Sequence, residues 1–135
     1  MARAVITNQE ALTIEHGEIL ERVDALLAEY DSPPMGTAET ESARLTRLSR
    51  TIDEMPEIYR WLVGLWSTCD HWTDAMADQF GMKDHNYKKM RERRDLFEKM
   101  ASAAKMRYES ASRVITILSG FDPTGMPRSR RGPDG

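Results

Sequence analysis

Residues 45–80 read LTRLSRTIDEMPEIYRWLVGLWSTCDHWTDAMADQF, and their apolar pattern is that of one long helical face. Its periodic positions recur at alternating intervals of three and four residues, the spacing that places side chains on one face of an α-helix. They are Leu45, Leu48, Ile52, Met55, Tyr59, Leu62, Trp66, Cys69, Thr73, Met76 and Phe80. Pro56 interrupts the stretch without changing its phase. The sequence therefore predicts helix over residues 40–80, either one helix kinked at Pro56 or two stacked helices, the second capped by Asp53.

The next stretch, residues 84–118, repeats the same spacing without a break. Asp84 is an expected N-cap for it, and Gly81 is an expected stop for the helix before it. Two long helices joined by so short a turn predict an antiparallel hairpin. Folding the chain about this turn sets large side chains against small ones along much of the seam, as close packing requires. At the far end of the hairpin, Leu48 is expected to meet Leu118.

A third helical pattern precedes the hairpin, over residues 8–30. Its apolar residues again follow intervals of three and four. Thr7 and Glu10 have the spacing of a capping box, in which each side chain accepts a hydrogen bond from the other residue's amide. Residues 31–36, DSPPMG, end the pattern because proline and glycine stop a helix and favour a loop. We expect one continuous helix that packs on the hairpin.

The fold class predicted from these patterns is all-α: an N-terminal helix packed on a long antiparallel helical hairpin, giving a coiled-coil-like arrangement of three helices. Residues 1–119 are expected to form a single helical domain, with helices at about 8–30, 40–80 and 84–118. Residues 120–135 are rich in Gly, Pro and Arg and have few apolar side chains, so we expect a disordered tail there.

Composition and motifs narrow the function classes. The chain has one cysteine, Cys69, which excludes an internal disulfide and makes a cytoplasmic location the simplest expectation. We find no apolar run long enough for a signal peptide or a membrane span, so no membrane partner is expected. His71, Asp74 and Asp78 share one helical face, but the Glu-x-x-His pairs that build metal sites between helices are missing. We therefore expect no enzyme activity, no cofactor and no metal.

A second apolar stripe on the middle helix lies beside the main seam. Its members are Ile58, Trp61, Leu65 and Trp72. The first helix is too short to cover the whole hairpin, and an apolar surface left uncovered usually marks an interface. We expect this stripe to form the interface of a homo-oligomer.

One charged residue, Arg94, occupies a seam position of the last helix. The facing layer of the middle helix contains Thr73, flanked by Asp70 and Asp74. We expect a cross-helix pair between Arg94 and one of these aspartates, which would fix the register of the hairpin. A role in holding a ligand is the alternative.

Charge is divided unevenly along the chain. Residues 1–82 carry 6 Lys/Arg and 15 Asp/Glu, a balance of −9, whereas residues 83–135 carry 13 and 7, a balance of +6. Repeated cations along one helix can bind the phosphate backbone of a nucleic acid without reading its sequence. The candidate contacts are Lys88, Lys89, Arg91, Lys105, Arg107 and Arg113. Alternatively, these cations pair with the interleaved Glu92, Asp95 and Glu98 or with the acidic half of the chain.

Two blocks carry a family resemblance. The first is MPEIYRWL, residues 55–62, which is similar to a Pro-x-hydrophobic-aromatic/His-x-aromatic-Leu stretch. The second is residues 104–117, where Ser112 and Arg113 precede apolar residues as in a Ser/Asn-Arg-x-x-x-Ile ending. Both blocks resemble the recombination mediator proteins of T-even-type phages (the UvsY type). The resemblance implies a small helical homo-oligomer that binds single-stranded DNA and helps to load a recombinase, in the host cytoplasm if the chain is phage-encoded.

The function expected from the sequence is therefore a non-enzymatic helical accessory protein that binds the backbone of single-stranded nucleic acid, as a phage-type recombination mediator does. The alternative is a helical module for protein–protein interaction, assembly or virion structure, with an unidentified protein partner and no nucleic-acid role.

Overall fold

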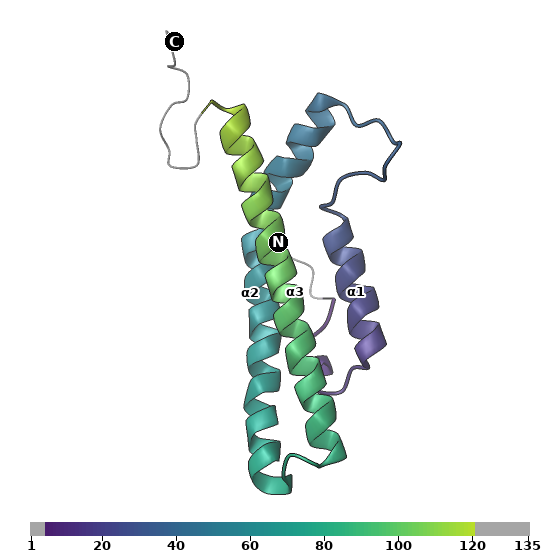
Figure 1. The fold of residues 1–135 in the computed structure, drawn as a ribbon, viewed down its shortest axis with the longest axis vertical. Coiled ribbons are helices and arrows are strands. Elements are labelled where there is room, and N and C mark those ends of the chain that lie inside the picture. Colours follow the sequence, from purple (N-terminus) through teal and green to yellow (C-terminus); the bar gives the residue numbers. More distant parts are fainter. Residues whose placement is uncertain (1–4, 121–135) are drawn as a thin grey trace.

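The computed structural model describes residues 5–120 of the chain. The described part contains the 3₁₀ turn η1 (Glu10–Leu12) and three α-helices, with no strand: α1 (His16–Ala28), α2 (Glu41–Phe80) and α3 (His85–Leu118). Helices α2 and α3 lie side by side and antiparallel, and α1 packs against this hairpin (Figure 1). The predicted all-α class and helical hairpin are confirmed. Residues 121–135 of the predicted tail lie outside the described residues.

Local hydrogen bonds fix the ends of the two hairpin helices. The Thr40 hydroxyl accepts a hydrogen bond from the amide of Ala43 at 3.0 Å, which caps the start of α2. Gly81 ends α2 with a φ of 86°, a conformation that favours glycine. The Asp84 carboxylate then accepts a hydrogen bond from the amide of Tyr87 at 3.0 Å and caps α3, as the sequence predicts. The turn is short because both stop and start signals lie within four residues.

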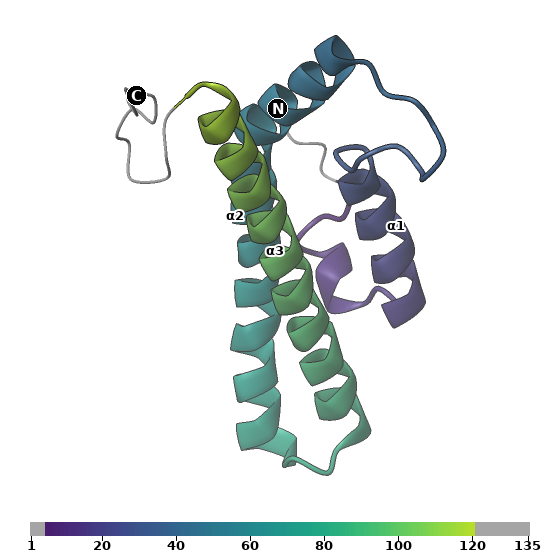
Figure 2. The same cartoon turned by 45° about the horizontal axis from the view of Figure 1, so that its top comes forward.

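Pro56 bends α2 without breaking it. The helix is continuous from Glu41 to Phe80, so the kinked single helix is the correct one of the two predicted alternatives. Proline has no amide hydrogen, so the carbonyl of Ile52 loses its helical partner and the helix can bend there. The part of α2 before this point leans away from α3 (Figures 1 and 2). Leu118 is 47% exposed, so the end of α3 lies outside the core, whereas Leu48, which the sequence sets against it, is buried.

The N-terminal segment differs most from the sequence prediction. The capping box between Thr7 and Glu10 forms, with both hydrogen bonds at 3.0 Å, but it caps only the short turn η1. The chain leaves the helical path after Leu12, and α1 begins at His16. One continuous helix over residues 8–30 is therefore wrong.

Hairpin side chains bind backbone carbonyls of this segment. The Trp61 indole donates to the carbonyl of Ile6 at 3.2 Å, and Arg93 Nε donates to the carbonyl of Ile14 at 2.8 Å. The Cys69 thiol lies 3.4 Å from the carbonyl of Ala11. These carbonyls accept hydrogen bonds from side chains of α2 and α3 instead of from amides of their own segment. Helical hydrogen bonding is therefore interrupted there.

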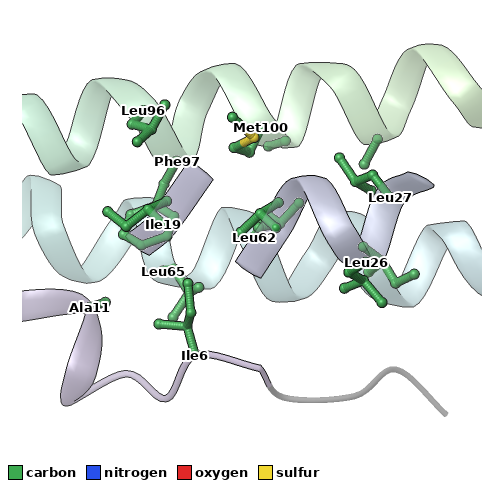
Figure 3. Packing of buried hydrophobic residues seen from close by; sticks show 14 of the residues in the cluster. Ile6, Ala11, Ile19, Leu26, Leu27, Leu62, Leu65, Leu96, Phe97 and Met100 are labelled. Carbon is green, nitrogen blue, oxygen red and sulfur yellow. The ribbon is translucent and has the colours of Figure 1, made fainter. Parts of the chain in front are cut away.

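The core lies between the N-terminal segment and the hairpin. Figure 3 shows side chains from all three helices meeting there, with the N-terminal residues Ile6 and Ala11 added from one side. Ile58 and Leu65 are fully buried in this core, and Trp61 is partly buried. The predicted oligomer interface of Ile58, Trp61, Leu65 and Trp72 is therefore not an exposed surface. Of these four residues, only Trp72 is well exposed, at 45%.

Ion pairs fasten the segment that joins α1 to α2, residues 29–40, which we call the connector. Arg107 of α3 holds Asp31 through two hydrogen bonds of 2.8 and 3.1 Å. Arg47 of α2 holds Glu39 through two more, at 3.0 and 3.2 Å. Beside them, the Tyr30 hydroxyl donates to Glu54 of α2 at 2.6 Å. These contacts hold both ends of the connector against the hairpin.

We expect Leu65→Ala to lower the free energy of unfolding by about 2–5 kcal/mol, because it opens a cavity beneath the N-terminal segment. Trp72→Ala is the matched change on the same stripe and should cost much less, because that indole is half-exposed. Urea unfolding followed by circular dichroism measures both. A Leu65→Ala effect that depends on protein concentration would place Leu65 between copies of the chain and contradict the packing.

Tyr30 should make stability depend on pH in the alkaline range. Burial, together with the hydrogen bond to Glu54, raises the pKa of Tyr30 to about 12, whereas an unfolded tyrosine titrates near about 10. The stabilisation is therefore complete below about pH 10 and is lost as the pH rises through about 12. We expect the stability difference between the wild type and Tyr30→Phe to shrink over that window, as measured by urea unfolding at a series of pH values. A difference that stays constant across it would contradict the buried hydrogen bond.

Candidate nucleic-acid interface

The six predicted cations of α3 lie on two different sides of the helix. Lys88, Arg91 and Lys105 share one side by helical periodicity, whereas Lys89 and Arg107 share the opposite one. The second side faces the N-terminal segment, because Lys89 lines a small depression with residues 14–16 and Arg107 contacts the connector. The structure does not bring the six residues together into one patch.

The side that faces the N-terminal segment uses its arginines within the chain. Arg107 forms the forked pair with Asp31, and Arg93 donates to the carbonyl of Ile14. These two guanidinium groups already have partners, so this side is not a ready-made phosphate site. Arg94 shares the side of Lys105 by helical periodicity. It lies 3.5 Å from Asp70 across the hairpin, as predicted, and also contacts Asp95 at 3.1 Å.

A shallow groove of about 270 Å³ runs between α2 and α3 on the other side of the hairpin. Three residues of α2 line it, and two of them are the aromatic residues Tyr59 and Trp66. Both are only partly buried and pack against the core with part of the side chain. Lys105 borders the groove from α3. The remaining lining residues are Val63, Glu98, Ala101 and Ser102.

The same side continues along α3 toward its C-terminal end. Tyr108 is 36% exposed and lines a second depression, of about 220 Å³, together with Arg113. The spacing of the sequence predicts Tyr108 inside the seam, but the bend of α2 leaves this part of α3 less covered. We call Tyr59, Trp66, Lys105, Tyr108 and Arg113 the groove face.

Three cations on this side have no acidic partner in the described part of the chain. Among residues 5–120, no carboxylate lies within 4.0 Å of the charged groups of Lys88, Lys105 or Arg113. Arg91 lies over the ring of Tyr87, 5.7 Å from its centre. Glu98 and Glu109 also border the two depressions and offset the charge of Lys105 and Arg113. This side therefore combines unpaired cations with three partly exposed aromatic rings.

The sequence located the cations but missed the groove. It assigned Tyr59 and Trp66 to the buried seam. The seam residues Met55, Leu62 and Cys69 are fully buried, but at the positions between them Ile58 and Leu65 are buried in place of Tyr59 and Trp66. The signal that could have shown this is the second apolar stripe. Two stripes side by side place the centre of the buried face between them, so the outer edge of the first stripe remains partly exposed.

The described residues offer no metal site and no reactive thiol. Among the described residues, no three His, Cys, Asp or Glu side chains are placed to share a metal ion. Burial raises the pKa of the Cys69 thiol to about 11, so it is protonated at neutral pH. The described helices include none with the length and apolar character that crossing a membrane requires.

Comparison of the chain with protein-family models, with curated proteins and with solved structures finds no match. The resemblance to the phage mediator proteins therefore stays a prediction.

Proposed function

We propose that this chain is a non-enzymatic accessory protein that binds single-stranded nucleic acid along the groove face. The observation that carries the proposal is the groove that places Tyr59 and Trp66 beside Lys105, with Tyr108 and Arg113 further along the same side. Stacking of a base on an aromatic ring is worth about 1–3 kcal/mol, and it tolerates any sequence because every base has a flat face. Lysine and arginine beside the rings add contacts to the phosphates.

A single strand suits this face better than a duplex does. The bases of a duplex are stacked on one another, so their faces are closed to protein side chains, whereas an unpaired base can turn onto a ring. The shallow groove also offers no projecting helix or ribbon to enter a duplex groove. The proposal therefore includes a preference for unpaired strands.

The residues that carry the family resemblance support this assignment. The first block, residues 55–62, contains Tyr59, and the second, residues 104–117, contains Lys105, Tyr108 and Arg113. The two blocks are far apart in the chain but border the same side of the hairpin. We include in the proposal the role that the resemblance implies, a homo-oligomer that helps to load a recombinase onto single-stranded DNA.

Reversing the two free cations of the groove face should weaken binding. For Lys105→Glu/Arg113→Glu, we expect at least a tenfold loss of affinity for a labelled single strand at about 0.1 M salt, because two phosphate contacts become repulsive. Each single-strand contact contributes about 0.7 to the slope of log affinity against log salt, so the slope should flatten by about 1.4. Fluorescence anisotropy at several salt concentrations measures both quantities.

The matched control is Lys83→Glu/Lys89→Glu, which changes the net charge equally at the hairpin turn and on the other side of α3. It should reduce affinity much less. An equal loss in both variants would mean that net charge alone matters, and absence of wild-type binding at low salt would refute the proposed function.

Tyr108 should act through its ring. We expect Tyr108→Ala to weaken single-strand binding by about 1–3 kcal/mol, whereas Tyr108→Phe, which keeps the ring, should bind like the wild type. The salt dependence should stay the same for both variants, because no phosphate contact is lost. The same anisotropy titration measures these effects. If Ala and Phe behave alike, the aromatic ring takes no part in binding.

A protein-interaction or assembly module remains the second candidate, because one feature of the structure favours it. Trp72, Phe80 and Met82 lie at and near the hairpin turn and are all substantially exposed. Exposed apolar side chains of this size are typical of protein interfaces. In that case the wild-type chain would bind no oligonucleotide, and its mass in solution would depend on a protein partner.

A further inference from the structure

The connector presents three carboxylates to three arginines of the hairpin. Glu29, Asp31 and Glu39 come from the connector, and they contact Arg50, Arg107 and Arg47 in that order. Two of the three pairs are forked, with two hydrogen bonds each. Forked pairing is the geometry with which arginine also binds phosphate, so these carboxylates occupy the positions that phosphate oxygens could take.

A cleft of about 470 Å³ lies at this place. Arg47 borders it from α2 and Arg107 from α3, while Tyr30, Asp31 and Ser32 close it from the end of α1 and the connector. The floor is partly apolar, with Leu48 and Ala111 among its residues. The bend at Pro56 sets α2 away from α3 at this end, which gives the cleft its width.

The connector is held weakly enough to open. Its residues are largely exposed, and Met35 at its middle is entirely so. The Glu29–Arg50 and Asp31–Arg107 pairs are partly exposed, and such pairs contribute little to stability because water and salt screen them. The Arg47–Glu39 pair is more enclosed, with side chains 18% and 17% exposed, and is the firmest of the three. Opening the connector would free guanidinium groups at the cost of a few surface contacts.

We infer that Arg47 and Arg107 form a second phosphate-binding site for a nucleic-acid strand, and that the acidic connector closes this site by occupying it in place of phosphate. The inference rests on the proposed function, since the ligand is the same single strand. Arg107 directly precedes Tyr108 on α3, so a strand bound on the groove face reaches the cleft by crossing the outer surface of this helix. Met106, on that surface, is 66% exposed and leaves the way open.

The test neutralises the connector without changing its shape. Asp31→Asn/Glu39→Gln removes the two carboxylates that hold Arg107 and Arg47. The control, Glu21→Gln/Asp24→Asn, makes the same change in net charge on the exposed side of α1, where neither residue has an ion pair within residues 5–120. Long-range electrostatics therefore cancel in the comparison.

We expect the connector variant to bind a labelled single strand at least fivefold more tightly than the control, with a salt slope steeper by about 1.4 for two added phosphate contacts. Adding Arg47→Gln/Arg107→Gln to the connector variant should abolish this gain. Equal affinity of the connector variant and the control, or a gain that survives the loss of both arginines, would overturn the inference.

The comparison is repeated with Lys105→Glu/Arg113→Glu present, which separates the two proposals. A gain in that background supports the cleft site whether or not the groove face binds. No gain there while the wild type binds normally overturns the cleft site and leaves the proposed function intact. Circular dichroism shows whether each variant folds. If Asp31→Asn/Glu39→Gln unfolds, the single variants Asp31→Asn and Glu39→Gln are each compared with Glu21→Gln, and the same outcomes decide.

Discussion

The break in helical hydrogen bonding between η1 and α1 determines how the N-terminal segment covers the hairpin. It frees carbonyls such as that of Ile14 to accept a hydrogen bond from Arg93 of α3, while Trp61 of α2 holds that of Ile6. Both helices of the hairpin are thereby tied to one segment, which covers Ile58 and Leu65. An extended stretch and a short turn follow the surface of two helices more closely than one straight helix could.

This arrangement makes the hairpin asymmetric. Two packed helices expose two sides, and the N-terminal segment is long enough to cover only one of them. The covered side uses two of its arginines within the fold, since Arg93 and Arg107 both bind groups of the segment or of the connector. The uncovered side retains partly exposed aromatic rings and cations without acidic partners. The groove face is thus a consequence of how the core is covered.

The sequence was sufficient to predict the hairpin, but not the path of the N-terminal segment that packs on it. The expected helices at 40–80 and 84–118 differ from α2 and α3 by one residue at their starts, because a long unbroken period and local caps determine both. The capping box at Thr7 was also correct, but a local signal cannot reveal that hairpin side chains will compete for the carbonyls that follow it. That competition involves residues as far apart as Arg93 and Ile14, which are separated by 79 positions.

The candidate site shows the same division between local and tertiary information. Lys105 and Arg113 could be identified as cations on a helix, but the sequence could not show whether they have acidic partners. Arg107, on the other side of α3, is paired with Asp31, which lies 76 positions away in the chain. Arginine suits forked pairing with a carboxylate, whereas lysine is a flexible point charge with less geometric demand. Along α3, Arg94 and Arg107 form carboxylate pairs, whereas Lys88, Lys105 and Arg113 have no carboxylate partner among residues 5–120. Arg94 and Arg107 thus serve the fold first, and they could serve a ligand only by exchanging a carboxylate for a phosphate.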